Sequence, residues 1–144
     1  MWYNPIIAWI LRSPLHGLLG GSLMVVTYKG RKSGKVYHTP VSCVRDGDTF
    51  LVVSFRKRMW WRNLRGGVPV IIRVKGRDWT TACEVVEDGE GVAANLMLYL
   101  REVPQYAQAF DVAVDADKQP DAGDVALAAQ TRVMIRIPSS ESES

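Results

Sequence analysis

The sequence predicts a mainly β domain with flanking helices (α+β), in which about six antiparallel strands close into a barrel. Short segments rich in β-branched and aromatic residues follow one another, and tight turns with Gly or Asp separate them. Helical spacing of apolar residues occurs only at the start of the chain and after the fifth expected strand. Consecutive short strands with tight turns favour closure into a barrel. The length of 144 residues suits one domain, which we expect to cover residues 1–138.

The expected strands cover residues 23–28, 35–45, 49–54, 68–74, 79–86 and 132–137. Before them, Asn4 as N-cap and Pro5 at the first helical position predict a helix within residues 1–14. The turn Asp46-Gly47-Asp48 is a strong hairpin signal, so the second and third strands must be antiparallel neighbours.

Three further segments are expected to be helical. A short helical turn over residues 59–64 ends at Gly66-Gly67, and two more helical segments cover residues 91–101 and 104–110. Residues 111–123 are polar, which predicts irregular structure, and the Ser-rich and Glu-rich residues 139–144 predict a disordered tail.

The composition excludes several classes of protein. Two cysteines and two histidines do not form a disulfide framework, and they make a tight structural metal site improbable, so we expect no metal. No apolar run approaches the roughly 18 residues that span a bilayer, and the N-terminus lacks the pattern of a secretory signal. We therefore expect a cytoplasmic protein.

Positive charge is concentrated in one half of the chain. Residues 29–77 contain 13 Lys and Arg against two acids, whereas residues 78–144 contain four Lys and Arg against 13 acids. This asymmetry suggests that one face of the protein binds an anion. The alternative is that the two halves pair with each other.

The turn from Lys29 to Lys35 combines cations with two glycines. Arg31 and Lys32 offer charge, Ser33 a hydroxyl, and the backbone around Gly34 offers N–H donors, which together suit a phosphate. The spacing matches neither a Walker loop nor a dinucleotide-binding fingerprint. Taken alone, a solvated hairpin is the more common explanation of such a turn.

The strand after this turn contains polar and aromatic side chains. Alternation places Tyr37, Thr39 and Val41 on one face and His38 and Ser42 on the other. Pro40 cannot donate to a strand ladder, so this stretch is expected at an edge or a bulge, where free backbone groups could contact the rim of a flavin. Tyr37 and His38 could equally be ordinary boundary residues.

A basic and aromatic cluster extends from Ser54 to Asn63, where four cations surround the adjacent Trp60 and Trp61. Such a cluster can stack a planar ring and neutralise an anionic tail. It could also bind single-stranded nucleic acid. The structural alternative is that at least one tryptophan anchors the short helical turn in the core.

In this order, these motifs resemble the deazaflavin-dependent nitroreductase family of F420H2-dependent quinone and nitro reductases. The motifs that carry the resemblance are Gly30-Arg31-Lys32-Ser33-Gly34, Thr39-Pro40, Arg45-Asp46-Gly47, Val52-Val53-Ser54 and Trp60-Trp61-Arg62-Asn63-Leu64. The resemblance covers residues 23–74 well. It implies a split β-barrel like those of flavin reductases and pyridoxamine-phosphate oxidases, and an enzyme that transfers a hydride from reduced F420 to a quinone, nitroaromatic or enone.

The resemblance also implies which residues bind the cofactor. Arg31, Lys32 and Ser33 would meet the phosphate and the oligoglutamate tail. The ring would be lined by Tyr37, His38, Thr39, Pro40, Val41 and Ser42, the second loop would contain Val53, Ser54, Phe55 and Arg56, and the helix start that closes the pocket would contain Met59, Trp60, Trp61, Arg62 and Asn63. Tyr106 is the nearest candidate for a substrate contact, and no catalytic triad is expected.

Two departures from the family pattern would narrow the ring slot. The loop between Ser54 and Met59 is short for the family, and Phe55 stands where a small polar residue is common. The alternatives therefore remain a split-barrel protein that binds FMN or another planar ligand, and a non-enzymatic binder of nucleic acid or another anion. We expect a small-molecule acceptor, a homodimer and no nucleic acid, with the N-terminal helix either capping the barrel or lying on a membrane surface.

Overall fold

The structure of the chain is a computed structural model that describes residues 22–139. The expected N-terminal helix at residues 1–14 and residues 140–144 of the expected tail lie outside these residues. The elements follow in the order β1 (Ser22–Lys29), β2 (Val36–Asp46), β3 (Thr49–Phe55), the 3-10 helix η2 (Trp60–Gly67), β4 (Pro69–Val74), β5 (Arg77–Ala82), β6 (Glu84–Val86), α2 (Gly89–Glu102), the 3-10 helix η3 (Pro104–Phe110), α3 (Ala122–Ala129) and β7 (Arg132–Pro138).

All seven described strands belong to one curled antiparallel sheet with the order β5-β4-β1-β2-β3-β7-β6. The long strand β2 is shared, because its first part pairs with β1 and its last three residues pair with β3. Only Cys83 separates β5 from β6, although these strands lie at opposite ends of the order. The two ends of the sheet must therefore approach each other, and the indole N–H of Trp79 in β5 donates to the Pro138 carbonyl in β7 at 3.0 Å.

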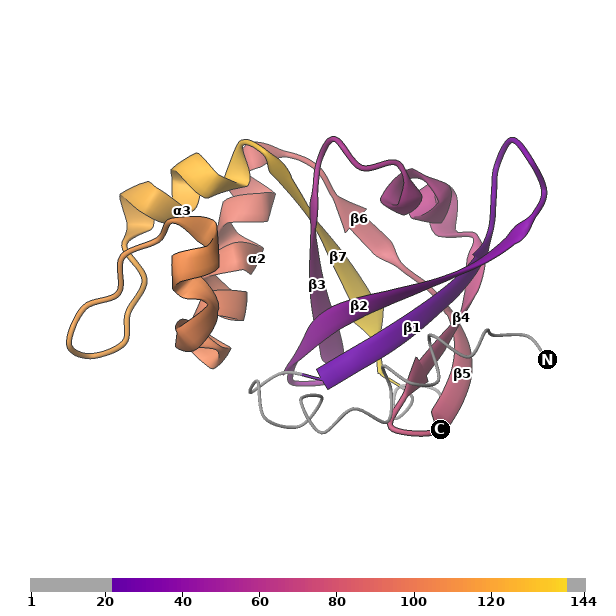
Figure 1. The fold of residues 1–144 in the computed structure, drawn as a ribbon, viewed down its shortest axis with the longest axis horizontal. Helices are drawn as coiled ribbons and strands as arrows, with labels where there is room; N and C mark the ends of the chain where they lie inside the picture. Colours follow the sequence, from indigo (N-terminus) through magenta and orange to yellow (C-terminus); the bar gives the residue numbers. More distant parts are fainter. Residues whose placement is uncertain (1–21, 140–144) are drawn as a thin grey trace.

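The curled sheet has two apolar layers. Inside the curl lies a core of alternate residues from β1, β3, β4 and β7 together with both tryptophans of η2. The outer faces of β3 and β7 pack against α2 and α3 in a second core, whose buried members include Leu51, Leu96, Val125 and Met134. Figure 1 shows the helices gathered on one side of the barrel and η2 near the turn between β1 and β2.

The helix α2 begins and packs as its sequence dictates. The Asp88 side chain accepts the N–H of Gly91 and so caps the first turn. Val92, Leu96, Tyr99 and Leu100 recur at helical spacing and are all buried against the sheet. Within residues 22–139, no helix is long and apolar enough to cross a membrane.

The mainly β architecture with flanking helices is confirmed, and three details differ from the prediction. The expected strand over residues 79–86 is two strands, because the chain turns at Cys83 and changes its pairing partner from β4 to β7. Residues 111–123 were expected to be irregular, but their end already forms the cap and first turn of α3, where Asp121 accepts the N–H of Asp124 at 2.9 Å. Ser139, expected to begin the tail, is buried and donates its N–H to the Asp48 carbonyl.

Candidate functional site

A pocket of about 370 Å³ lies between the β1–β2 turn and the start of η2. It is lined by Tyr28, Gly30, Arg31, Lys32, Ser33, Tyr37, Met59, Trp60 and Asn63. Two segments that are distant in sequence therefore build one site, with the basic turn on one side and the aromatic start of η2 on the other.

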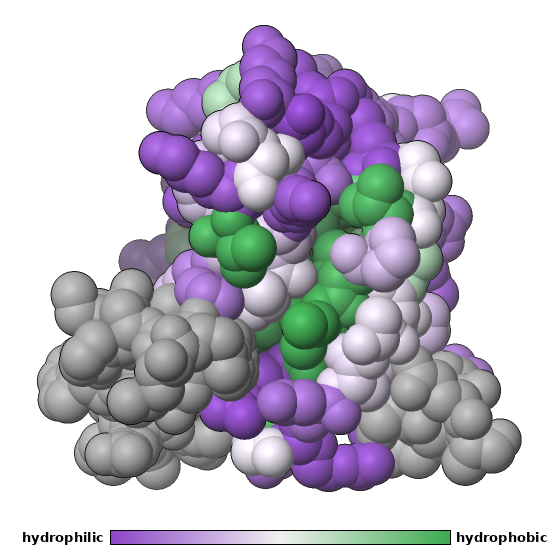
Figure 2. Space-filling model, turned by 90° about the vertical axis from the view of Figure 1, so that its right-hand side faces the viewer, coloured by the Kyte–Doolittle hydropathy of each residue, from purple (hydrophilic) through white to green (hydrophobic). Residues whose placement is uncertain are grey.

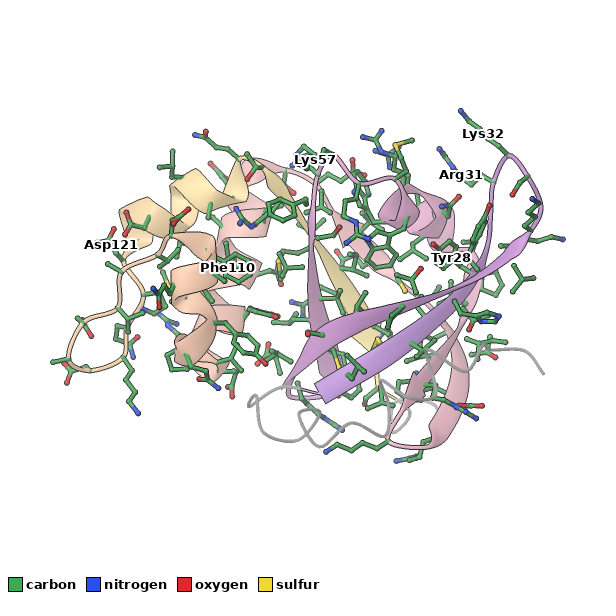
Figure 3. All side chains as sticks on the ribbon, viewed as in Figure 1. Tyr28, Arg31, Lys32, Lys57, Phe110 and Asp121 are labelled. Carbon is green, nitrogen blue, oxygen red and sulfur yellow. The ribbon has the colours of Figure 1, made fainter. Side chains whose placement is uncertain are left out.

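The basic turn is held by its own backbone. The Gly30 N–H donates to the Lys35 carbonyl at 2.8 Å, and the Gly34 N–H donates to the Gly30 carbonyl at 3.0 Å. Gly34 has a φ of 72°, a value that glycine adopts without steric cost. This closure leaves Arg31, Lys32 and Ser33 at the exposed tip, and Figure 3 shows Arg31 and Lys32 projecting there.

The two cations at the tip are available to an anion. Within residues 22–139, neither the Arg31 guanidinium nor the Lys32 ammonium makes an ion pair or a hydrogen bond. Figure 2 shows hydrophilic side chains crowding the upper end of this face of the molecule, above a band of apolar surface. Because the acids Asp46 and Asp48 belong to the β2–β3 turn at the far end of β2, they do not neutralise these cations.

Three aromatic side chains form the inner wall of the pocket. The rings of Tyr28 and Tyr37 are stacked with their centroids 5.7 Å apart, and the Trp60 ring lies 6.2 Å from that of Tyr28. The Tyr28 hydroxyl is hydrogen bonded to Thr39 Oγ1 at 2.9 Å, and burial raises the pKa of this phenol. The Trp60 indole N–H donates to Ser54 Oγ at 3.0 Å, which fixes the orientation of that ring.

Gly30 is required by the packing of this wall. A Cβ at this position would lie 2.8 Å from both Ser33 Oγ and Tyr37 Cε2. Those two side chains are also joined by a hydrogen bond of 3.3 Å between their hydroxyls. The absence of a side chain at Gly30 therefore lets Tyr37 and Ser33 pack directly over the backbone of the turn.

Asn63 joins the two sides of the pocket. Its Oδ1 accepts the backbone N–H of Arg31 at 2.9 Å, and its Nδ2 donates to the Trp60 carbonyl at 3.1 Å. One amide side chain thus contacts the basic turn and the first residue of η2.

Several residues expected at the ring lie elsewhere. Thr39 reaches the pocket through Tyr28, and Val41 packs against the barrel core, which agrees with the predicted alternation. His38 faces the opposite side of the sheet, where its Nδ1 is hydrogen bonded to Thr27 Oγ1 at 2.9 Å and partial burial lowers its pKa. Pro40 and Ser42 are exposed and do not line the pocket.

The expected second loop contributes through Ser54 alone. Val53 packs toward the helices, and the Arg56 guanidinium donates to the carbonyls of Glu87 and Arg132. Phe55 does not narrow the ring slot: its exposed ring lies under the Arg132 guanidinium at 4.7 Å. The short loop turns this side chain toward β7 and away from the pocket.

Trp61 and Arg62 have a structural role. Trp61 is only 1% exposed and anchors η2 in the barrel core, as the structural alternative for one tryptophan predicted. The guanidinium groups of Arg62 and Arg65 both lie 4.9 Å from the centre of its ring. Of the pair, only Trp60 lines the pocket.

Tyr106, the expected substrate contact, does not line the pocket. It packs against the helical core, with its ring 6.4 Å from that of Tyr99. Phe110, which follows it in η3, also lies among the helices in Figure 3, across the molecule from Arg31 and Lys32. The structure therefore places Tyr106 away from this pocket, and its contact with a substrate stays a prediction.

Tyr28 is the pocket residue that no sequence motif contained, and Gly30 belonged to the basic motif but was not expected to line the pocket. Tyr28 was overlooked because it ends an apolar strand, yet it alternates with the inward residues Met24 and Val26 directly before the basic turn. This alternation is the signal that could have placed it beside Tyr37.

Comparison with known proteins identifies both a family and a fold. The model of the F420H2-dependent quinone reductase family matches residues 13–117. The comparison with curated proteins gave no match.

Solved structures show the same fold at low identity. An FAD and heme binding protein from Mycobacterium smegmatis has a TM-score of 0.57 and 15% identity over 90% of this chain and 67% of its own. An F420-H2 dependent reductase has a TM-score of 0.52 and 16% identity over 80% and 92%. A domain-swapped dimer has a TM-score of 0.51 and 16% identity over 92% and 98%. The predicted split β-barrel is confirmed by these neighbours.

Proposed function

This chain belongs to the F420H2-dependent quinone reductase family, and from that premise we propose that it transfers a hydride from reduced F420 to a small organic acceptor, with a quinone as the first candidate. Membership of this family makes the protein an oxidoreductase with coenzyme F420 as its cofactor. When bound, the reduced deazaflavin supplies the hydride, so the protein needs to supply binding, orientation and exclusion of water.

The residues of the pocket fit such a cofactor. F420 carries a planar ring at one end and a phosphate with an anionic tail at the other. Two cations without partners in residues 22–139 and a hydroxyl stand at the mouth, and three aromatic rings form the inner wall. The single observation that carries the proposal is that these two features line one pocket.

We assign the tail to Arg31, Lys32 and Ser33, since charge-assisted hydrogen bonds to phosphate are stronger than neutral ones. The aromatic wall of Tyr28, Tyr37 and Trp60 offers the ring a flat, apolar surface. Trp60 is held by Ser54 and Tyr28 by Thr39, so this surface is ordered before the ligand binds.

The experiment is titration of the purified protein with F420 and, separately, with FMN, followed by cofactor fluorescence. We expect saturable binding of F420 in the micromolar range and weaker binding of FMN. Turnover is then measured as oxidation of reduced F420 by a naphthoquinone, a nitroaromatic and an enone. Binding of FMN with no response to F420 would contradict the proposal.

The second candidate is a split-barrel protein that uses FMN. It is favoured by the shared fold of the FAD and heme binding protein from Mycobacterium smegmatis, because its ligand also has a flavin ring and phosphate. The same titration separates the two candidates. A nucleic-acid binder is the least favoured, since the family membership supplies a ligand for the basic turn.

We also propose a homodimer and a cytoplasmic location. The domain-swapped dimer among the structural neighbours supports the former, and light scattering after size-exclusion chromatography measures it. The membrane contact expected of residues 1–14 stays a prediction, which sedimentation with lipid vesicles tests.

A further inference from the structure

We propose that Asn63 is a positioning residue that couples the anion-binding turn, residues 30–35, to Trp60 at the start of η2, the part of the ring-binding wall that comes from the other side of the pocket. This inference rests on the proposed function, because it concerns how one ligand with two unlike ends is held. The family resemblance implied a direct contact between Asn63 and the cofactor, and the geometry points to an indirect role.

Both polar atoms of the Asn63 amide are used by the backbone. Oδ1 accepts the N–H of Arg31 at 2.9 Å, and Nδ2 donates to the carbonyl of Trp60 at 3.1 Å. These two bonds use one lone pair of Oδ1 and one N–H of Nδ2, and they hold the turn and η2 relative to each other.

No other hydrogen bond among the described residues 22–139 joins the turn at residues 30–35 to η2. The turn's remaining bonds stay within its own hairpin: two join Gly30 to Lys35 and Gly34 to Gly30, and Ser33 Oγ accepts the Lys35 N–H and is hydrogen bonded to the Tyr37 hydroxyl. Trp60 has its own support from Ser54. The turn with Tyr37 and the start of η2 with Trp60 are therefore each ordered by their own bonds, and Asn63 sets the separation between the turn and Trp60.

A fixed separation matters only to a ligand that contacts both halves. For such a ligand, binding at one end raises the effective concentration of the other end at its subsite. This gain depends on the two subsites keeping a distance that the ligand can span. A ligand with one end gains nothing from the coupling. Loss of Asn63 should therefore lower the affinity for the whole cofactor more than the affinity for either of its parts.

The test compares the parent protein with Asn63→Ala. Three probes are titrated: F420, the deazaflavin riboside that lacks the phosphate and tail, and inorganic phosphate. We expect F420 affinity to fall roughly 10-fold, as the loss of about two hydrogen bonds predicts. We expect the riboside and phosphate affinities to change by less than about twofold, because neither spans the two halves.

Asn95→Ala is the matched control. Asn95 is also half-buried, donates to the Gly91 carbonyl at 2.8 Å and accepts from Arg136, but it lies on α2. It should therefore lower the melting temperature without changing any of the three affinities. Hydrogen exchange of the turn, residues 29–35, gives a readout that needs no ligand: it should accelerate in Asn63→Ala and stay unchanged in Asn95→Ala.

The outcomes separate this inference from the proposed function. If Asn63→Ala lost as much affinity for the riboside as for F420, or as much for phosphate as for F420, Asn63 would contact the ring end or the phosphate end directly. Either result would overturn the coupling role. If the parent does not bind F420, the proposed function fails, but hydrogen exchange still tests the role of Asn63. An exchange rate of the turn that is the same in Asn63→Ala and the parent overturns the inference. If Asn63→Ala does not fold, Asn63→Asp replaces it, because Asp keeps an acceptor for the Arg31 N–H. The amide hydrogens of residues 29–35 in Asn63→Asp must then exchange as slowly as in the parent.

Discussion

Gly30 determines part of the shape of the pocket, because the Tyr37 ring and the Ser33 hydroxyl both pack closely against its backbone. We expect Gly30→Ala to displace both side chains, since its Cβ would approach each to 2.8 Å. F420 affinity should fall at least about 5-fold, the equivalent of one lost hydrogen bond. Fluorescence titration measures it, and Gly89→Ala, where a Cβ meets nothing within 4 Å, is the control. Equal affinity of Gly30→Ala and the parent would show that Tyr37 does not contact the ligand.

Arg31 and Lys32 provide the charge at the mouth of the pocket. Charge-assisted bonds to a phosphate are worth about 1.5–3 kcal/mol each, so Arg31→Ala with Lys32→Ala should weaken F420 binding at least about 100-fold. Binding by the parent should also weaken as salt is raised, and this dependence should be shallower in the double variant.

The control for that double variant is Arg101→Ala with Lys118→Asn. It removes the same net charge from exposed positions on the helical side, and Asn tolerates the positive φ of 61° at Lys118. Binding by the control should equal that of the parent. If both double variants lower the affinity for F420 equally, the effect comes from net charge and the turn is not the phosphate site.

At the level of single residues, the sequence predicted what depends on local pattern. Alternation along β2 correctly separated Tyr37 and Thr39 from His38, because a strand repeats every two residues. It could not show that Phe55 turns toward Arg132, since that contact joins positions far apart in the chain. For the same reason it could not show that Tyr106 packs against Tyr99, because the packing of η3 against α2 is set by tertiary contacts.

The element that carries Trp60 is tied to the rest of the fold by an ion pair. Arg65 in η2 donates to both carboxylate oxygens of Glu87, at 2.9 and 2.6 Å, and this lowers the pKa of Glu87. Arg56 also donates to the Glu87 carbonyl at 2.6 Å. The short segment after β6 therefore joins η2 to the end of β3.

This ion pair predicts a pH-dependent contribution to stability. Because the native pKa of Glu87 lies below its unfolded value of 4.5, the contribution is complete above that value and is lost as the pH falls through the native pKa. Glu87→Gln should lower the melting temperature by about 2 °C at pH 7, a small effect because both side chains are partly exposed. In thermal unfolding, the difference from the parent should shrink steadily as the pH is lowered below 4.5, and a difference that stays constant would mean that the charge is not its source.

At the level of elements, strands were easier to predict than their partners. The hairpin of β2 and β3 follows from a local turn, so sequence was sufficient. Residues 79–86 carry one continuous strand pattern, and nothing local marks Cys83 as the point where pairing moves from β4 to β7. The helix α3 was missed because small and polar residues surround its few buried positions, although Asp121 before Asp124 is a capping signal.

Two cores on opposite faces of one sheet divide the molecule into a binding side and a supporting side. The barrel core contains Trp60 and Tyr28, whose rings form the pocket wall, whereas the helical core contains no residue of the pocket. Cys83 belongs to the barrel core, and burial raises the pKa of its thiol to about 12, so it is an unreactive packing group.

This division predicts that stability and cofactor affinity can be changed separately. Val92 on α2 is fully buried in the helical core, so Val92→Ala should cost about 2 kcal/mol of unfolding free energy. Its F420 affinity should equal that of the parent, because the sheet lies between this position and the pocket. A saturating ligand should then raise the melting temperature of both proteins by a similar amount, since the stabilisation depends only on ligand concentration and affinity.

The matched change on the other core is Val26→Ala, which removes the same two methyl groups from a fully buried position two residues before Tyr28. Val26→Ala should lower the free energy of unfolding by a similar amount. It should also lower the affinity for F420, because the cavity it creates lies beneath the aromatic wall. Chemical denaturation and fluorescence titration measure the two quantities on the same samples. Loss of affinity in Val92→Ala equal to that in Val26→Ala would contradict the separation, because the helical layer would then act on the pocket through the sheet.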